Sequence, residues 1–448
     1  MKRPLGIDLF AGAGGLSLGF EQAGFDVAAA VEIDPVHASV HKFNFPNCTV
    51  IPRSIQDLSG EDIRTHSGIG DQEVHVVFGG APCQGFSLIG QRALDDPRNS
   101  LVKDFVRVVS ELNARFFVFE NVKGLTVGKR RAFLDEVIEE FNRAGYNVLT
   151  PWKVLNAHDF GVPQDRARLF LVGARAGFNL PRYPVPTTRP ADRPNGDGSI
   201  PIGPTCFDAL GDLPDAESFE ELLKNDAVET EGWDDPSVYA RDLRCLSNDA
   251  WAYGYPRVWE PEKLTSSLRT QHTDISRTRF AGTEPGTVEP ISRFFKLSGS
   301  GISNTLRAGT DSSRGAFTSP RPIHYAYPRC VTVREMARLH GFPDWFRFHA
   351  TKWHGARQVG NSVPPPLARA VAAEVMNASE IAPYRPETLV ELGDIRFLTM
   401  DMSEAASYWE VPVPIGKRDK KSGARKRKQH EIEAERLSSA TETQTVSH

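Results

Sequence analysis

The sequence contains few cysteines and no long apolar run. Only five of its 448 residues are cysteine, and they show neither the paired spacing of a metal site nor a disulfide-like pattern. No apolar stretch reaches the roughly 18 residues of a membrane-spanning helix, and the first residues lead directly into a predicted strand without a signal-peptide pattern. A sparse, odd set of cysteines is typical of a reducing compartment. We therefore expect a cytoplasmic protein with no metal site and no contact with a membrane.

An excess of charge of one sign is also lacking, since the formal net charge is −4. The distribution is uneven, however. Residues 201–250 carry 3 basic and 13 acidic side chains, a net charge of −10, whereas residues 251–330 carry 11 basic and 6 acidic, a net charge of +5. A basic surface beside an acidic one fits a polyanionic partner that must be oriented. An ordinary uneven surface is the alternative interpretation.

The first 34 residues predict a nucleotide-binding βαβ unit. A strand at 5–10, a glycine-rich turn, a helix to about 23 and a second strand at 27–31 follow one another. Glu32 lies 20 residues after Gly12, which is the spacing at which an acid reaches a ribose hydroxyl. A dinucleotide fingerprint would need glycine at the position of Ser17, so a nicotinamide cofactor is disfavoured. The turn instead favours a smaller cofactor without a pyrophosphate, such as S-adenosylmethionine, and a turn without a ligand is the alternative.

Reactive and acidic side chains follow the next predicted strands. Cys83 lies on a glycine- and proline-bounded loop after the apolar run 74–78, and Glu120 follows the apolar residues 116–119. Asp57 ends a third predicted strand at 50–57, where a helix cap is the alternative reading. Ligands bind at the carboxyl edge of an open parallel sheet. We therefore expect these side chains to face one site, although an isolated buried cysteine is usually inert packing.

Two arginines enter a later predicted strand. Arg166 and Arg168 are two residues apart and so point to the same side of that strand. Guanidinium groups at the same edge as Cys83 and Glu120 suit a phosphate or a polar base edge. A solvated sheet edge is the alternative.

The chain length predicts two to three domains. Strand–helix alternation ends near Gly177 and helical periodicity returns near Val331, with a loop-rich region between them. We predict an α/β domain at 1–177, a separate loop-rich domain at 178–325, and a further segment at 326–385. Residues 386–448 are predicted to be an extension, with a flexible tail that carries eight basic residues between 417 and 428.

Six of these segments together resemble the cytosine-C5 DNA methyltransferase family, in the order in which the family has them. They span residues 5–377 and depart from the pattern at no catalytic position. The segments are Asp8-Leu9-Phe10-Ala11-Gly12-Ala13-Gly14-Gly15, Pro82-Cys83-Gln84, Glu120-Asn121-Val122, Gln164-x-Arg166-x-Arg168, Arg334-Glu335 through Gly341-Phe342-Pro343, and Gly360-Asn361-Ser362-Val363.

The resemblance implies the fold of the S-adenosylmethionine-dependent methyltransferases, which is a Rossmann-like, doubly wound, mostly parallel sheet with a smaller loop-rich target-recognition domain. It implies that residues 1–177 are the catalytic and cofactor-binding domain, that residues 178–325 are the target-recognition domain, and that residues 326–385 complete the catalytic domain. It also implies a mechanism. The Cys83 thiolate adds to C6 of a cytosine that is flipped out of duplex DNA, so that C5 becomes nucleophilic. Glu120 donates a proton to N3, and Arg166 and Arg168 hold the base carbonyl and the flanking backbone. The implied cofactor contacts are Phe10, Gly12, Gly14, Glu32, Asp57, Pro82, Asn361, Ser362 and Val363.

The same resemblance assigns DNA contacts to two regions. The loop from Gly85 to Asn99, with Ser87, Gln91 and Arg92, looks like the element that closes over the flipped base. The recognition domain contains Thr305-Leu306, a dipeptide that the family keeps there. Its net-positive half offers side chains of the kind that read the major groove, namely Arg269, Gln271, Arg277 and Arg279.

Two other functions remain as alternatives. A methyltransferase for cytosine in tRNA shares the catalytic segments, but the roughly 150-residue insert between Gly173 and Val331 favours DNA. A non-catalytic DNA-binding relative should lack Cys83 or Glu120, and both are present. We expect a monomeric prokaryotic enzyme in the cytoplasm, associated with the nucleoid, which is solitary or belongs to a restriction-modification system. Double-stranded DNA is the expected partner, and a cognate restriction endonuclease that acts on the same site is a further candidate.

Overall fold

The computed structural model describes residues 2–82, 99–126, 130–190, 199–310 and 319–413. Cys83 and three predicted loop residues, Ser87, Gln91 and Arg92, lie outside the described residues, as does the basic run at 417–428. The description therefore covers the walls of the predicted site but not the predicted nucleophile.

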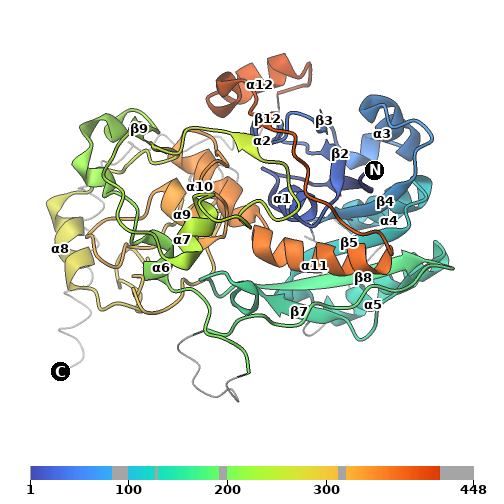
Figure 1. The fold of residues 1–448 in the computed structure, drawn as a ribbon, viewed down its shortest axis with the longest axis horizontal. Coiled ribbons are helices and arrows are strands. Elements are labelled where there is room, and N and C mark those ends of the chain that lie inside the picture. The colour runs from blue at the N-terminus through green and yellow to red at the C-terminus, as the bar shows by residue number, and fades with distance from the viewer. Residues whose placement is uncertain (1, 83–98, 127–129, 191–198, 311–318, 414–448) are drawn as a thin grey trace, which may run out of the picture.

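A mostly parallel sheet of eight strands forms one half of the protein, on the right in Figure 1. The strand order is β3-β2-β1-β4-β5-β8-β6, with β7 also paired to β8. The five strands from β3 to β5 are parallel, and β8 is antiparallel to its neighbours. This confirms the predicted α/β class. The strands are β1 (Leu5–Leu9), β2 (Asp26–Val31), β3 (Thr49–Ile51), β4 (Val74–Gly79), β5 (Phe116–Val122), β6 (Tyr146–Val148), β7 (Lys153–Asn156) and β8 (Ala167–Arg175).

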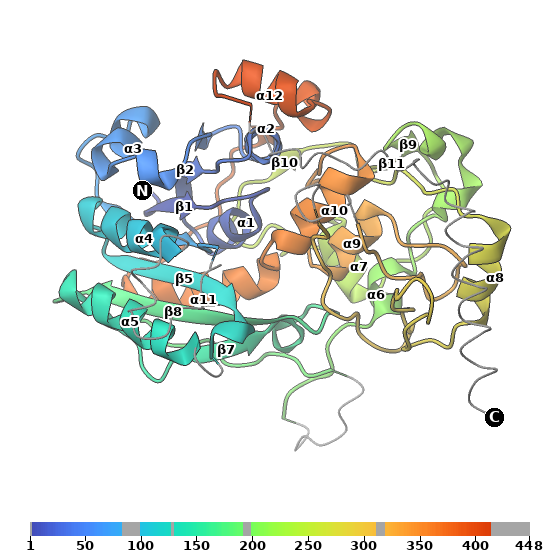
Figure 2. The same ribbon diagram turned by 180° about the vertical axis from the view of Figure 1, so that it is seen from behind.

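Helices cover both faces of the sheet and form two separate apolar cores. The first core lies under α1 (Gly15–Gln22), α2 (Pro35–Asn44) and α11 (Pro365–Ala378). The second lies under α3 (Gly60–Ser67), α4 (Ser100–Glu111) and α5 (Arg130–Arg143), which Figure 2 shows from their own side. Buried on both faces, the parallel strands are almost wholly apolar, as the sequence pattern predicted.

The helix α11 returns from far along the chain to pack against α1, and a glycine makes this approach possible. A Cβ atom on Gly19 would lie 2.3 Å from Ala368 Cβ and 2.7 Å from the backbone nitrogen of Arg369. The two helix backbones are thus nearly in contact. The helix α11 therefore belongs to the helix layer that covers the α1 face of the sheet.

The insert at 178–325 contains short elements joined by loops, and lies beside the sheet together with α9 and α10 (Figure 1). Its polar interior joins it to α9. Arg329 pairs with Asp215 and Glu335, and Arg338 binds Asp212 and Asp344. These elements are α6 (Cys206–Leu210), β9 (Val228–Glu229), α7 (Val238–Leu243), β10 (Arg257–Val258), β11 (Lys263–Leu264), α8 (Asp274–Gly282), α9 (Val333–Leu339) and α10 (Lys352–Asn361).

One part of the insert lies against the catalytic domain. Arg257 Nη2 is 2.8 Å from Glu21 Oε2 at the end of α1, and the Tyr255 hydroxyl donates to Asp26 Oδ1 at 2.8 Å. The strand β10 pairs in parallel with β12 (Val390–Glu391). The predicted boundaries at 178 and 325 therefore do not separate all contacts of the two domains.

The structure corrects one prediction about local order. The strand predicted at 50–57 ends at Ile51, and Ile55–Asp57 form a short 3₁₀ helix. Further along the chain, β6 and β7 flank the cis peptide bond Thr150–Pro151. The described part of the predicted extension runs from 386 to 413, where α12 (Met402–Tyr408) packs beside α2 and the Trp409 indole donates to Ser39 Oγ at 2.9 Å.

None of the described helices combines the length and the apolar character that crossing a bilayer requires.

The close approach of α1 and α11 predicts the effect of one methyl group. Gly19→Ala should lower the free energy of unfolding by about 1–3 kcal/mol, because the added Cβ must push α11 away. Gly282→Ala is the matched control, since the ideal Cβ at that helical glycine meets no described atom within 4 Å. Urea unfolding of both variants measures the difference. Equal stability of the two would show that α1 and α11 are not as tightly packed as described.

Candidate active site

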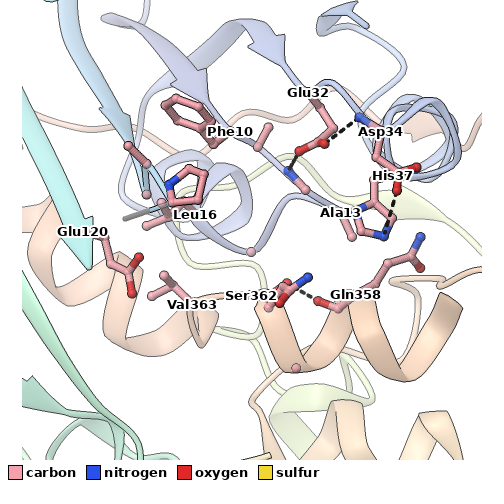
Figure 3. Close-up of a pocket in the computed structure, with 18 of the residues that line it drawn as sticks. Phe10, Ala13, Leu16, Glu32, Asp34, His37, Glu120, Gln358, Ser362 and Val363 are labelled. Carbon is pink, nitrogen blue, oxygen red and sulfur yellow. Dashed lines mark hydrogen bonds and ion pairs between the residues drawn. The ribbon is translucent and has the colours of Figure 1, made fainter. Parts of the chain in front are cut away.

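A cavity of about 630 Å³ opens at the carboxyl edge of β1, β2, β4 and β5, and α10 and the Ser362–Val363 turn after it close its other side (Figure 3). This is the edge at which the sequence predicted a site. Its lining contains most of the predicted cofactor contacts. These are Phe10, Gly12, Glu32, Pro82, Asn361, Ser362 and Val363, joined by the predicted catalytic residues Glu120 and Arg168.

Glu32 fixes the glycine-rich turn between β1 and α1. Its Oε2 accepts from the Gly12 backbone N–H and its Oε1 accepts from the Asp34 N–H, each at 2.8 Å. Phe10 and Gly12 have φ angles of 63° and 57°, so the chain turns sharply there. Burial raises the pKa of Glu32, and the neighbouring Asp34 carboxylate adds to this effect. Glu32, which the sequence predicted to bind a ribose hydroxyl, therefore also holds the glycine-rich turn in its conformation.

Apolar groups lie at the other end of the same wall. Ile33 lines the cavity although its side chain is 62% exposed, and Phe10 and Pro82 line it as well. An exposed aliphatic side chain at a cavity mouth is available to a flat apolar ligand group.

Glu120 lies at the end of β5 and faces the cavity (Figure 3). Its Oε1 is 2.9 Å from Arg168 Nε on the adjacent strand β8. Burial raises the pKa of Glu120, and Arg168 and then Arg166 oppose this rise. Gly80 leaves the space that the carboxylate needs, because a Cβ there would lie 2.5 Å from Glu120 Oε2.

Asn121 binds the backbone just before Cys83. Its side-chain amide donates to the Ala81 carbonyl at 2.9 Å, and both groups are buried. The Asn121 side chain thereby fixes the last described residues before Cys83 against β5. The sequence pattern included Asn121 without assigning it a role.

Arg166 does not line the cavity, although it is two residues from Arg168. Its guanidinium is fully buried and donates to the carbonyls of Leu306, Gly360 and Ser362 at 2.9, 2.7 and 2.8 Å. Burial lowers the pKa of this group well below its usual value. All three acceptors are backbone atoms, so Arg166 holds the Leu306 segment and the Gly360–Ser362 turn in place. Direct contact with a base is not what this geometry offers.

The rest of the Gln164-x-Arg166-x-Arg168 motif strengthens the same junction. Gln164 accepts from the Leu306 N–H at 3.2 Å through Oε1, and its Nε2 lies 3.0 Å from His340 Nδ1. The Thr305 hydroxyl donates to the Asp165 carbonyl at 2.6 Å. Thr305, predicted to contact DNA, therefore binds the catalytic domain in this structure.

Two predicted cofactor contacts do not line the cavity. A Cβ on Gly14 would lie 2.4 Å from the Phe45 ring, so this glycine packs against α2 and the residue after it. Asp57 is exposed on the 3₁₀ helix that follows β3. Their roles stay predictions.

The predicted DNA-reading residues lie in the recognition domain, and most of them have protein partners. Arg269 donates to the Phe219 carbonyl at 3.1 Å, Arg277 pairs with Glu217, and Arg279 Nε is 3.5 Å from Glu289. Gln271 is exposed. The DNA contact of each of these four residues remains a prediction. The three arginines would have to leave their protein partners to bind DNA, whereas Gln271 is already exposed.

A buried polar chain supports the glycine-rich turn from beneath. The Ser17 hydroxyl donates to Asp8 Oδ2 at 2.6 Å and lies 2.9 Å from His41 Nε2. Burial raises the pKa of Asp8 to about 8, and burial lowers the pKa of His41 to about 3. All three side chains are fully buried. At neutral pH this chain is therefore mostly uncharged, which suits an apolar interior.

The chain resembles known proteins along most of its length. The model of the C-5 cytosine-specific DNA methylase family matches residues 5–377. The Type II methyltransferase M.XorII of Xanthomonas oryzae is 57% identical over 415 residues, which is 93% of this chain and 94% of that protein. The Type II methyltransferase M1.HphI of Haemophilus parahaemolyticus is 35% identical over 84% of this chain and 87% of its own. A crystal structure described as a prophage-encoded DNA modification methyltransferase of E. coli has a TM-score of 0.66 and 31% identity, covering 84% of this chain and all of that one.

The three-carbonyl binding by Arg166 predicts a large effect of a conservative change. Arg166→Lys should lower the free energy of unfolding by about 2–4 kcal/mol, because one ammonium cannot reach all three buried carbonyls and each unpaired one costs about 1–3 kcal/mol. Arg168→Lys is the control and should cost less, since Arg168 makes one ion pair at the cavity edge. Urea unfolding without ligand compares them. A smaller loss in Arg166→Lys would contradict a positioning role.

The raised pKa of Asp8 predicts a pH dependence of stability. Below about pH 4 Asp8 is protonated in both states and contributes no difference. Between about pH 4 and 8 the unfolded carboxyl is ionised while the folded one holds its proton, so stability falls by up to about 1.4 kcal/mol per pH unit. Asp8→Asn should lack this decline.

Urea unfolding of wild type and Asp8→Asn at pH 5 and pH 8 measures the difference. Asp62→Asn serves as the control, because hydrogen bonds from Ser59 lower the pKa of Asp62 and so place its titration below this window. Identical pH slopes in wild type and Asp8→Asn would mean that Asp8 is ionised in the folded protein.

Proposed function

Because the chain belongs to the C-5 cytosine-specific DNA methylase family and is thus a DNA cytosine-5 methyltransferase, we propose that it transfers a methyl group from S-adenosylmethionine to one cytosine of a specific duplex sequence through Cys83. The observation that carries this proposal is the Glu120–Arg168 pair, which faces a cavity bordered by Pro82, the residue before Cys83.

The cavity residues fit S-adenosylmethionine. Glu32 offers a carboxylate beside the glycine-rich turn, where ribose hydroxyls can donate to it. Phe10, Ile33 and Pro82 provide the apolar surfaces that an adenine ring requires. S-adenosylmethionine supplies an electrophilic methyl group. Ser362 and Val363, on the opposite wall, lie where they can contact the amino-acid end.

The residues of this chain activate the cytosine. The Cys83 thiolate forms a bond to C6, and the displaced electron pair moves toward C5 and N3. Burial raises the pKa of Glu120, which favours the protonated form that can donate to N3 as charge develops there. After C5 has taken the methyl group, a water molecule accepts the C5 proton, the C5–H electron pair re-forms the C5–C6 double bond and the C6–S bond breaks to release the thiolate, while the N3 proton returns to Glu120.

The two arginines have different roles in this proposal. Arg168 orients the Glu120 carboxyl and lies at the cavity, where it can also donate to the base carbonyl. Arg166 positions the Gly360–Ser362 turn and the Leu306 segment from behind. A cytosine that is flipped out of the DNA duplex must be bound in a pocket whose residues are held rigidly in place.

The recognition domain sets the target. We extend the proposal to the same target sequence as that of M.XorII, because the 57% identity covers 93% of the chain and so includes most of the 178–325 region. A restriction endonuclease for that site is the corresponding partner. The enzyme would act as a monomer on chromosomal DNA in a prokaryotic cytoplasm.

The catalytic assignment predicts a separation of chemistry from binding. Cys83→Ala should reduce methyl transfer to background, while specific duplex binding persists, because the substitution removes only the nucleophile. Methylome sequencing of a methylation-free host that expresses either form measures transfer, and gel-shift titration measures binding. Transfer by Cys83→Ala at the wild-type rate would refute the covalent mechanism.

The shared-target assignment is tested by cross-protection. DNA that M.XorII has fully modified should accept almost no radiolabelled methyl groups from this enzyme, and the reverse order should give the same result. Unmodified DNA of the same plasmid is the control. Undiminished incorporation into pre-modified DNA would show that the two enzymes have different targets.

A further inference from the structure

The described extension, residues 386–413, packs against two helices that border the cavity. The first turn of α2 and the last turns of α10 contribute to the cavity lining. Within the extension, α12 and the 3₁₀ helix η9 (Ile395–Leu398) lie beside α2, at the top of Figure 1. The extension therefore lies behind the cavity wall rather than in it.

The extension is bonded closely to α2. The Gly393 N–H donates to the Phe43 carbonyl at 2.9 Å, and a Cβ on Gly393 would lie 2.9 Å from Phe43 Cα. One turn earlier on α2, Ser39 Oγ accepts from the Trp409 indole. Leu398 is buried in the apolar core under α2. A shift of the extension would therefore have to shift α2 as well.

His349 joins the same extension to α10. Its Nε2 lies 3.0 Å from the Met400 carbonyl oxygen, and its backbone N–H donates to Gln358 Oε1 at 2.9 Å. A carbonyl oxygen only accepts, so Nε2 carries the hydrogen and Nδ1 accepts from the Thr351 N–H at 3.1 Å. Burial lowers the pKa of His349, which agrees with this neutral form. Both ring nitrogens are thus held by the backbone.

The connection continues to the turn that follows α10. The Ser362 hydroxyl donates to the Gln358 carbonyl at 2.7 Å, and Figure 3 shows both residues across the cavity from Glu120. Next to His349, the Ala350 N–H donates to the Leu398 carbonyl at 2.8 Å. The loop before α10 is therefore bonded to the extension at two successive residues.

We propose that the extension sets the spacing of α2 and α10, and that His349 is the positioning residue through which it acts on the cavity wall. The affinity for the methyl donor then depends on residues that touch no ligand. This inference rests on the proposed function. The family match ends at residue 377, so the extension lies outside it. Asn44 also bonds to Arg347 across this junction, but from the last residue of α2, at the end away from the cavity.

Two substitutions of His349 separate positioning from stability. In His349→Gln the amide nitrogen can replace Nε2 as the donor to the Met400 carbonyl, whereas the shorter amide of His349→Asn reaches only as far as Nδ1. Isothermal titration calorimetry of the full chain with S-adenosylhomocysteine should give a Kd within about twofold of wild type for His349→Gln. For His349→Asn the Kd should be at least about fivefold weaker. Turnover at saturating methyl donor should change less than about twofold in both variants, because neither alters Cys83 or Glu120.

Gly393→Ala tests the contact with α2 independently, because the added Cβ must push the extension away from Phe43. The same weakening of the Kd by at least about fivefold is expected. Ile395→Ala is the matched control on η9, since this side chain is 57% exposed, and its Kd should equal that of wild type.

Urea unfolding of each variant accompanies the titrations. A wild-type Kd in both His349→Asn and Gly393→Ala, with only the free energy of unfolding lowered, would show that the extension merely stabilises the fold and would overturn the inference. Equal weakening by His349→Gln and His349→Asn would overturn the role of the Met400 bond. If the wild type itself did not bind S-adenosylhomocysteine, the proposed cofactor would be wrong instead.

Discussion

A single buried guanidinium joins the three parts of this protein. Arg166, the residue before β8, donates to the Leu306 carbonyl and to two carbonyls of the turn at the end of α10. The neighbouring Gln164 and Asp165 hold the Leu306 segment as well, but only Arg166 binds both that segment and the Gly360–Ser362 turn among the described contacts of this motif. A buried cation without partners would be very costly, so the three carbonyls must stay where the group can reach them. The cavity wall opposite Glu120 depends on this arrangement.

Much of the fold and the site follows directly from the sequence. The apolar strands, the glycine-rich turn and the acids at strand ends are local patterns, and the carboxyl edge of a parallel sheet brings such residues together. Glu32, Glu120, Arg168 and the Asn361–Val363 turn therefore lie around one cavity, as expected. The family resemblance placed the segment after residue 326 in the same domain, and the contact of α11 with α1 agrees with that placement.

The remainder depended on contacts that no local pattern encodes. The sequence pattern does not distinguish Arg166 from Arg168, because both enter the same strand on the same side. Arg166 is buried and bonded because the Leu306 carbonyl, 140 residues away in the sequence, lies beside it. The end of β3 and the interruption between β6 and β7 are set by neighbouring strands rather than by propensity.

The attachment of residues 253–258 to the catalytic domain has a consequence for exchanging specificity between relatives. This short stretch lies inside the insert by sequence, but its Tyr255 and Arg257 bind Asp26 and Glu21 beneath the sheet. A transplanted module that replaced the whole interval would leave Glu21 as a buried acid without its counterion, and the recipient would lose stability whatever DNA it read. The segment that can be exchanged between relatives is therefore discontinuous. An exchange of the 178–325 insert should keep the recipient's own residues 253–258.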